Sequence, residues 1–185
     1  MTRAGHRRPI QRPPLKTPAW EGLRPTSDKL RETLFNIVAP RLAGARVLDG
    51  YAGTGAVGIE ALSRGAAHVT FVEQDRRAVH LIEENLAACG VEADYTIERR
   101  DVISAVRRVT GAAFDLVWLD PPYDIADVSD ALDAAARVLA PEGLLVLERA
   151  TRREPVVPAS LARVRDVKSG DSTLTFFTVS TRDRQ

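Results

Sequence analysis

The feature that most constrains the fold is a regular alternation of short apolar runs with amphipathic segments through the middle of the chain. Continuous apolar runs are typical of strands buried on both faces, whereas apolar residues at helical spacing are typical of helices packed on a sheet. The alternation therefore predicts a doubly wound, Rossmann-like α/β domain with a mostly parallel sheet. Strands are expected over 45–49, 68–72, 95–98, 114–119 and 144–147, and helices over 56–64, 76–89, 102–109 and 128–139.

The tail of the chain departs from this alternation. Residues 163–167 and 173–179 read as strands on either side of a turn over 168–172. This spacing is typical of an antiparallel hairpin that closes the sheet, not of a further strand–helix unit. A second turn is expected over 141–143, just before the fifth strand.

The head of the chain is basic and rich in proline. Residues 1–25 hold five of the eleven prolines, which predicts an extended or disordered segment. Residues 1–24 carry six Lys and Arg against one acid, whereas the whole chain has a net charge of only +1. Such a basic arm favours an anionic partner. We therefore divide the chain into an arm over 1–23 and a domain over 24–185.

Composition narrows the functional classes. The single cysteine, Cys89, excludes an intrachain disulfide and favours the reducing cytosol. The three histidines lie on different expected elements, so no metal site is expected. No apolar run approaches the length of a membrane span. We expect a cytoplasmic monomer with neither a metal nor a membrane partner.

A glycine-rich loop follows the first strand. Gly53, Gly55 and Gly58 form a G-x-G-x-x-G pattern between the strand over 45–49 and the helix over 56–64. Glycines at this place let the backbone approach a ligand at the carboxyl edge of the sheet. Proteins that bind NAD, FAD or S-adenosylmethionine all use the pattern, and a tight turn alone would also explain it.

Carboxylates at the strand ends favour S-adenosylmethionine. Asp49 can accept a hydrogen bond from the cationic amino-acid part of this cofactor, but it would repel a pyrophosphate. Glu73 ends the second strand, where an acidic residue usually binds the ribose diol, although it could be a solvated strand end. Asp101 follows the third strand, where it can accept from the adenine amino group, cap the next helix, or do both.

The motif that identifies the chemistry is Asp120-Pro121-Pro122-Tyr123, directly after the strand over 114–119. The prolines stiffen the loop, so the Asp120 carboxylate and the Pro121 carbonyl can both accept from one amino group. An exocyclic base amine is a poor nucleophile, and two acceptors on its hydrogens draw it toward tetrahedral geometry. Tyr123 can stack on the base. The alternative is a rigid structural turn.

These motifs resemble those of the class I amino methyltransferases, and the finer similarity is to the bacterial 16S ribosomal RNA guanine-N2 methyltransferases of the RsmD type. Three stretches carry the resemblance, over 24–37, 60–66 and 168–177. The resemblance implies a seven-stranded sheet and S-adenosylmethionine as the cofactor. It also implies methyl transfer to N2 of one guanine in small-subunit ribosomal RNA, within an assembled or assembling particle.

The motifs and the resemblance together give the candidate site. The catalytic candidates are Asp120, Pro121, Pro122 and Tyr123; the cofactor candidates are Asp49, Tyr51, Gly53, Gly55, Glu73 and Asp101; the RNA candidates are Arg24, Thr26 and Arg31. Two alternatives remain open. The same loop serves adenine-N6 methylation of nucleic acids and glutamine methylation of proteins, and a catalytically silent relative could act in ribosome assembly.

Overall fold

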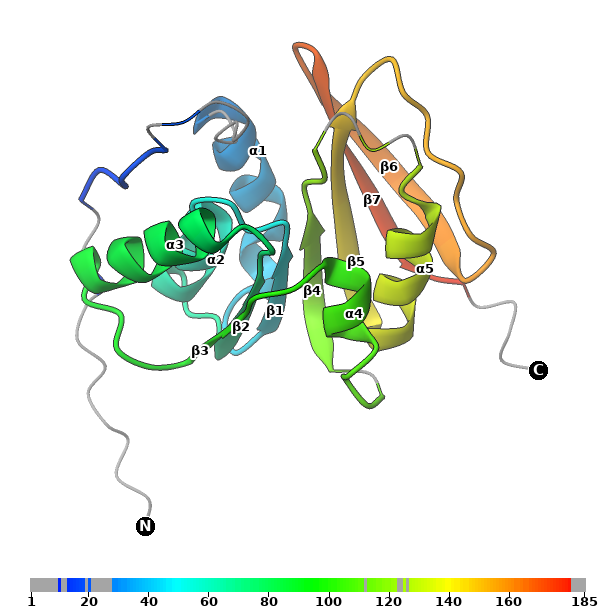
Figure 1. Cartoon of the computed structure of the whole chain (residues 1–185). Helices are drawn as coiled ribbons and strands as arrows, with labels where there is room; N and C mark the ends of the chain where they lie inside the picture. The colour runs from blue at the N-terminus through cyan, green and yellow to red at the C-terminus, as the bar shows by residue number, and fades with distance from the viewer. Residues whose placement is uncertain are drawn as a thin grey trace.

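A mixed sheet runs through the centre of the molecule (Figure 1). The computed structural model describes residues 10, 13–18, 20, 28–111, 113–122, 125 and 127–180. Within them the sheet has seven strands in the order β3-β2-β1-β4-β5-β7-β6. The first five are parallel, and β7 is antiparallel to both β5 and β6, which confirms the expected fold class. The strands are β1 (Arg46–Gly50), β2 (His68–Val72), β3 (Tyr95–Glu98), β4 (Phe114–Leu119), β5 (Leu139–Ala150), β6 (Leu161–Ser169) and β7 (Ser172–Val179).

Helices cover both faces of the sheet (Figure 1). They are α1 (Asp28–Val38), α2 (Ala56–Ser63), α3 (Arg76–Ala88), α4 (Val102–Val106) and α5 (Ser129–Val138), and a short 3-10 turn, η1 (Ala39–Arg41), follows α1. Helices α1, α2 and α3 pack on one face around Trp118 and Phe71. Helices α4 and α5 pack on the other face around Leu119 and Leu147. Burial of each large apolar side chain stabilises these layers by about 1.5–3 kcal/mol.

The start of β5 differs from the sequence prediction. The expected turn over 141–143 lies inside β5, because the chain becomes extended at Leu139 directly after α5. Leu139 pairs with Phe114, and the pairing shifts before Leu116. At this bulge a Cβ on Gly143 would lie 2.7 Å from the Leu139 side chain and 2.8 Å from the Ala140 carbonyl oxygen. The glycine that suggested a turn therefore permits a bulge.

Two other boundaries also move. The helix expected over 102–109 ends at Val106, since Arg107 is its C-terminal cap. The hairpin turn is tighter than the expected 168–172, because β6 runs to Ser169 and β7 begins at Ser172. Gly170, with a φ of 61°, supplies the left-handed conformation that so short a turn needs.

Part of the arm is anchored on the domain. Residues 13–18 form neither helix nor strand, as the prolines predict. Nevertheless Leu15 and Ile10 pack against the core that α1, α2 and α3 cover. The backbone of Lys16 exchanges two hydrogen bonds with the buried Asn85 side chain of α3, at 2.8 and 3.2 Å. Among the described residues, no helix is long and apolar enough to cross a membrane.

Candidate active site

The glycine-rich loop connects β1 to α2 at the carboxyl edge of the sheet. Gly53 and Gly55 have φ angles of 56° and 77°, in the left-handed region that favours glycine. Gly58 serves another purpose, because a Cβ there would lie 2.2 Å from Cε1 of Phe71 in β2. Two glycines thus shape the turn, and the third lets α2 pack closely on the sheet.

Asp49 is the buried acid of the site, with 1% of its surface exposed. Its Oδ2 accepts a hydrogen bond of 2.8 Å from the backbone N–H of Gly58, in the first turn of α2. Burial raises the pKa of Asp49 to about 8; the Gly58 hydrogen bond opposes this shift, and the charge of Glu73 adds to it. A buried acid of this kind favours a cation beside it, because a positive charge offsets the cost of ionising it.

Glu73 fastens the glycine-rich loop to the end of β2. One oxygen accepts from the N–H of Gly53 at 3.0 Å, and the other accepts from the N–H of Asp75 at 2.9 Å. Glu73 is therefore more than a solvated strand end. Each carboxylate oxygen can accept a second hydrogen bond, so these contacts leave room for a ribose hydroxyl. The role of Glu73 as a ribose ligand remains a prediction.

Asp101 and Tyr51 lie on the next part of the same edge. Asp101 caps α4 by accepting from the N–H of Ser104 at 2.8 Å, which confirms the capping prediction. The hydrogen bonds from Ser104 lower the pKa of Asp101. Tyr51 has a φ of 63°, which is unusual for a residue with a side chain. Burial, and then the charge of Asp101, raises the pKa of Tyr51, so the two side chains share one electrostatic environment.

The Asp120-Pro121-Pro122 segment begins where β4 ends. The N–H of Asp120 donates to the carbonyl of Gly50 at 3.4 Å, which continues the β1–β4 ladder by one residue. Asp120 is half-buried, Pro121 is buried and Pro122 is exposed. The loop then folds back, with the N–H of Ile125 donating to the carbonyl of Pro122 at 3.1 Å. Tyr123 lies outside the described residues.

The sheet order brings the predicted acids to one edge. The strands β3, β2, β1 and β4 are neighbours, and their carboxyl ends lead to Asp101, Glu73, Asp49 and Asp120 in turn. Arg31 is half-buried in the first turn of α1, which runs antiparallel to β1 and therefore begins near this edge (Figure 1). The other RNA candidates, Arg24 and Thr26, lie outside the described residues.

Sequence reasoning missed a cavity beside the proline loop. The cavity has a volume of about 320 Å³ and lies between the β4–α5 loop and the β5–β6 loop. Pro121 and Pro122 line it together with Glu148 and Arg149 at the end of β5. The one available signal was a pair of charged residues, Glu148 and Arg149, directly after a wholly apolar strand.

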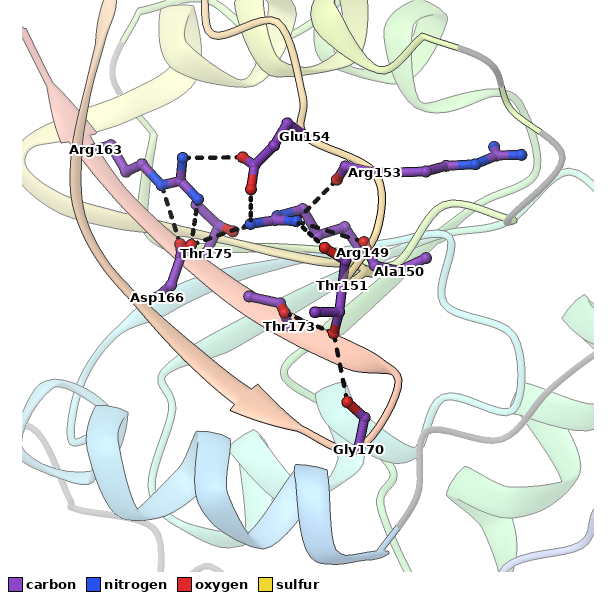
Figure 2. A network of polar contacts seen from close by, with 10 residues as sticks. All are labelled: Arg149, Ala150, Thr151, Arg153, Glu154, Arg163, Asp166, Gly170, Thr173 and Thr175. Atoms are coloured by element: carbon purple, nitrogen blue, oxygen red, sulfur yellow. Dashed lines mark hydrogen bonds and ion pairs between the residues drawn. The ribbon is translucent and has the colours of Figure 1, made fainter.

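Arg149 is a buried cation at the centre of a polar network (Figure 2). Its guanidinium donates to the Arg153 carbonyl at 2.8 Å and to Thr175 Oγ1 at 2.9 Å. It also forms ion pairs of 3.0 Å with Glu154 and with Asp166. The Arg153 guanidinium in turn donates to the Ile125 carbonyl at 3.3 Å. The network thus connects the closing hairpin to the loop that carries the Asp-Pro-Pro motif.

Asn85 was also missed, although a lone amide on the apolar face of α3 was a visible signal. Its Nδ2 donates to the Thr54 carbonyl in the glycine-rich loop at 2.9 Å. Its side chain also holds the Lys16 backbone, so one buried amide joins the arm to the cofactor loop. Among the described residues, no group of His, Cys, Asp and Glu side chains could hold a metal ion.

The comparisons with known proteins agree with this geometry. The family model described as conserved hypothetical protein 95 matches residues 9–178. The ribosomal RNA small subunit methyltransferase D of Haemophilus influenzae is 33% identical over 81% of this chain and 80% of its own length. The protein of the same name from Escherichia coli K12 is 34% identical over 84% of this chain and 79% of its own length.

A solved structure supports the same assignment. A hypothetical protein from Thermus thermophilus is 31% identical and superposes with a TM-score of 0.75 over 92% of this chain and 96% of its own. The two proteins therefore share their fold over most of their length. The chain belongs to the conserved hypothetical protein 95 family, together with relatives named ribosomal RNA small subunit methyltransferase D.

Proposed function

We propose that this protein transfers a methyl group from S-adenosylmethionine to the exocyclic N2 amino group of a guanine in small-subunit ribosomal RNA. The observation that carries the proposal is that Asp120 and Pro121 directly follow β4, the strand next to β1, and that the end of β1 leads into the glycine-rich loop. The names of the relatives from Haemophilus influenzae and Escherichia coli support ribosomal RNA as the substrate.

The residues at the carboxyl edge fit S-adenosylmethionine. The buried Asp49 would accept from its cationic amino group, and Glu73 would accept from its ribose hydroxyls. Asp101 and Tyr51 would border the adenine, and the glycine-rich loop with Gly53 and Gly55 leaves room for the amino-acid part. Because Asp49 has a pKa of about 8, a cation at this place would stabilise a charge that the free protein disfavours.

Catalysis in this proposal is mainly positioning. The cofactor supplies an electrophilic methyl group on a positively charged sulfur. The Asp120 carboxylate and the Pro121 carbonyl accept the two amine hydrogens, which aims the nitrogen lone pair at the methyl carbon. The surplus proton of the methylated amine would leave to Asp120 or to water. Pro122 stiffens the loop, and Tyr123 would stack on the base.

RNA would approach over the arm and the start of α1. Arg24, Thr26 and Arg31 lie at or beside that helix start, and the basic residues of the arm would contact phosphates, which carry no base information. We propose that the protein acts as a monomer on the assembling small subunit, in the cytoplasm where ribosomal RNA is made.

Mass spectrometry of ribosomal RNA from a strain that lacks this protein tests the proposal. We expect one N2-methylguanine of the small subunit to disappear and to return when the wild-type gene is restored. Loss of N6-methyladenine instead would identify adenine as the target. An unchanged set of modified nucleosides in ribosomal RNA would contradict the proposed function.

A further inference from the structure

Glu148, near the end of β5, has an unusual environment for a carboxyl group. Only 5% of its surface is exposed. Its Oε2 is buried and has no hydrogen-bond partner among the residues that the structure describes. Leaving a buried acceptor unpaired costs about 1–3 kcal/mol, and more for a charged group. Such an atom is available to accept a hydrogen bond from a ligand.

The register of the sheet places Glu148 beside Asp120. Strands β4 and β5 are parallel, and Leu119 pairs with Leu147, so Asp120 and Glu148 each follow by one residue. Leu119 and Leu147 both pack in the core under α4 and α5. Since side chains alternate along a strand, the next residue of each strand is directed to the other face. Neighbouring strands lie about 4.8 Å apart, so Asp120, directly after β4, and Glu148, near the end of β5, lie side by side on one face of the sheet.

Glu148 also lies next to the proline loop. Glu148 borders the cavity of about 320 Å³ beside Pro121 and Pro122. Its side chain is directed to the opposite face from Leu147, which lines the cavity on the side of α5. The neighbouring Arg149 lines it too, but its guanidinium is already engaged with Thr175, Glu154 and Asp166. Burial raises the pKa of Glu148 to about 7, against the effect of a hydrogen bond with Ser172. Above pH 7 the ionised form, which can only accept hydrogen bonds, therefore predominates.

We propose that Glu148 determines base specificity, by accepting the N1–H of guanine while Asp120 and Pro121 hold the adjacent amino group. This assignment rests on the proposed function. Guanine presents two adjacent donors, N1–H and the N2 amino group. Adenine and cytosine present a ring acceptor beside their amino groups, so their ring nitrogens would face the ionised Glu148 with a lone pair. Two neighbouring acids thus match the donor pair that distinguishes guanine.

The test compares guanine with 2-aminopurine at the target position of reconstituted small subunits. 2-Aminopurine keeps the amino group, but its N1 is an acceptor. Single-turnover methylation by the wild-type protein, measured above about pH 8 where Glu148 is ionised, should favour guanine by about 100-fold, within the range of one good base contact. Glu148→Ala should slow methylation of guanine by a similar factor and leave that of 2-aminopurine nearly unchanged. The preference should therefore fall close to one.

Two further variants keep this result interpretable. Glu148→Gln retains an oxygen acceptor and the shape of the side chain, and should keep an intermediate preference for guanine. Glu142→Gln changes an exposed glutamate at the other end of β5 and should behave as the wild type. Thermal melting and cofactor affinity, measured in parallel, show that the variants fold.

The outcomes separate the two proposals. A wild-type protein that methylates guanine, with an unchanged preference in both Glu148→Ala and Glu148→Gln, overturns the role of Glu148 and leaves the proposed function in place. A wild-type protein that leaves ribosomal guanine unmodified contradicts the proposed function, and the role of Glu148 falls with it.

Discussion

The carboxylates in the two halves of the carboxyl edge differ in their hydrogen-bond partners. In the half formed by β1, β2 and β3, each candidate carboxylate already accepts a backbone N–H, as Asp49 does from Gly58 and Glu73 does from Gly53. In the half formed by β4 and β5, Glu148 keeps a buried oxygen without a partner among the described residues, beside a cavity. The first half thus has its carboxylates fixed by the backbone, whereas the second keeps one buried acceptor available for a ligand.

The largest effect that we expect on stability comes from Arg149. Arg149→Ala removes the buried donor to Thr175 and to the Arg153 carbonyl, whereas Asp166 keeps Arg163 as a partner. The free energy of unfolding should fall by about 2–3 kcal/mol. Denaturant titration measures this change. Arg152→Ala removes an exposed arginine from the same segment and should cost little. Equal losses in both variants would show that the network does not hold the proline loop.

Asp49 should couple cofactor binding to proton release. At pH 7 its carboxyl group, with a pKa of about 8, is mostly neutral in the free protein, and a bound cation would lower that pKa. Calorimetry of S-adenosylmethionine binding in two buffers of different ionisation enthalpy should show a proton released. Asp49→Asn should abolish the release and weaken binding by about 10- to 100-fold, as expected for a charge-assisted contact. If the wild type binds S-adenosylmethionine without releasing a proton, the cationic amino group of the cofactor does not lie beside Asp49.

The same group gives a pH dependence of stability. Because the folded pKa of Asp49 is raised from 3.8 to about 8, its contribution is fully present below pH 4 and is lost as the pH rises through 8. The free energy of unfolding of the cofactor-free protein should therefore fall more steeply over this window in the wild type than in Asp49→Asn.

A smaller effect is expected at Asn85, where the arm meets the cofactor loop. Asn85→Leu keeps the volume but leaves the Thr54 carbonyl and the Lys16 backbone unpaired, which should cost about 1–2 kcal/mol of stability. Cofactor affinity should fall a few-fold, since the glycine-rich loop loses an anchor. Glu84→Gln removes only the exposed ion pair with Lys16 and should change neither quantity appreciably. An Asn85→Leu protein with wild-type stability and affinity would show that this link is incidental.

The arm should have the smallest effect on the folded domain. Replacing Arg7, Arg8 and Arg12 with glutamine should flatten the salt dependence of RNA binding by roughly one unit of slope per lost phosphate contact. Cofactor affinity should stay the same. Deleting residues 1–22 is a less clean test, because it also removes the contacts of Leu15 and Lys16 with the domain. An unchanged salt slope would show that these arginines do not contact RNA.

The sequence predicts the cofactor half better than the base half, and the reason is physical. In the cofactor half, the strands over 68–72 and 95–98 were predicted with their observed bounds, because apolar runs and turn residues are local signals. In the base half, β4 was predicted equally well, whereas β5, expected over 144–147, runs from Leu139 to Ala150. The glycine-rich loop and the acid at each strand end are likewise fixed by neighbours in sequence. Local sequence patterns are therefore enough to predict a part of the site that consists of one strand and the loop after it.

Features that depend on distant partners were missed. Arg149 is buried among partners that come from the closing hairpin, Thr175 and Asp166. Asn85 is buried against Lys16, which is 69 residues away in the sequence. The start of β5 follows from its pairing with β4, which the pattern of a turn does not reveal. The unpaired oxygen of Glu148 becomes visible only once the register beside Asp120 is known.

The most direct test of the two-part site is single-turnover methylation of undermethylated small subunits by Asp120→Ala, with S-adenosylmethionine affinity measured in parallel. Loss of one acceptor for the amine hydrogens should slow methyl transfer by about 100-fold or more, while cofactor affinity stays the same. Tyr123→Ala should also slow transfer, and Tyr123→Phe should keep most of the activity. A wild-type rate in Asp120→Ala would show that the Asp-Pro-Pro segment is only a turn and would contradict the proposed mechanism.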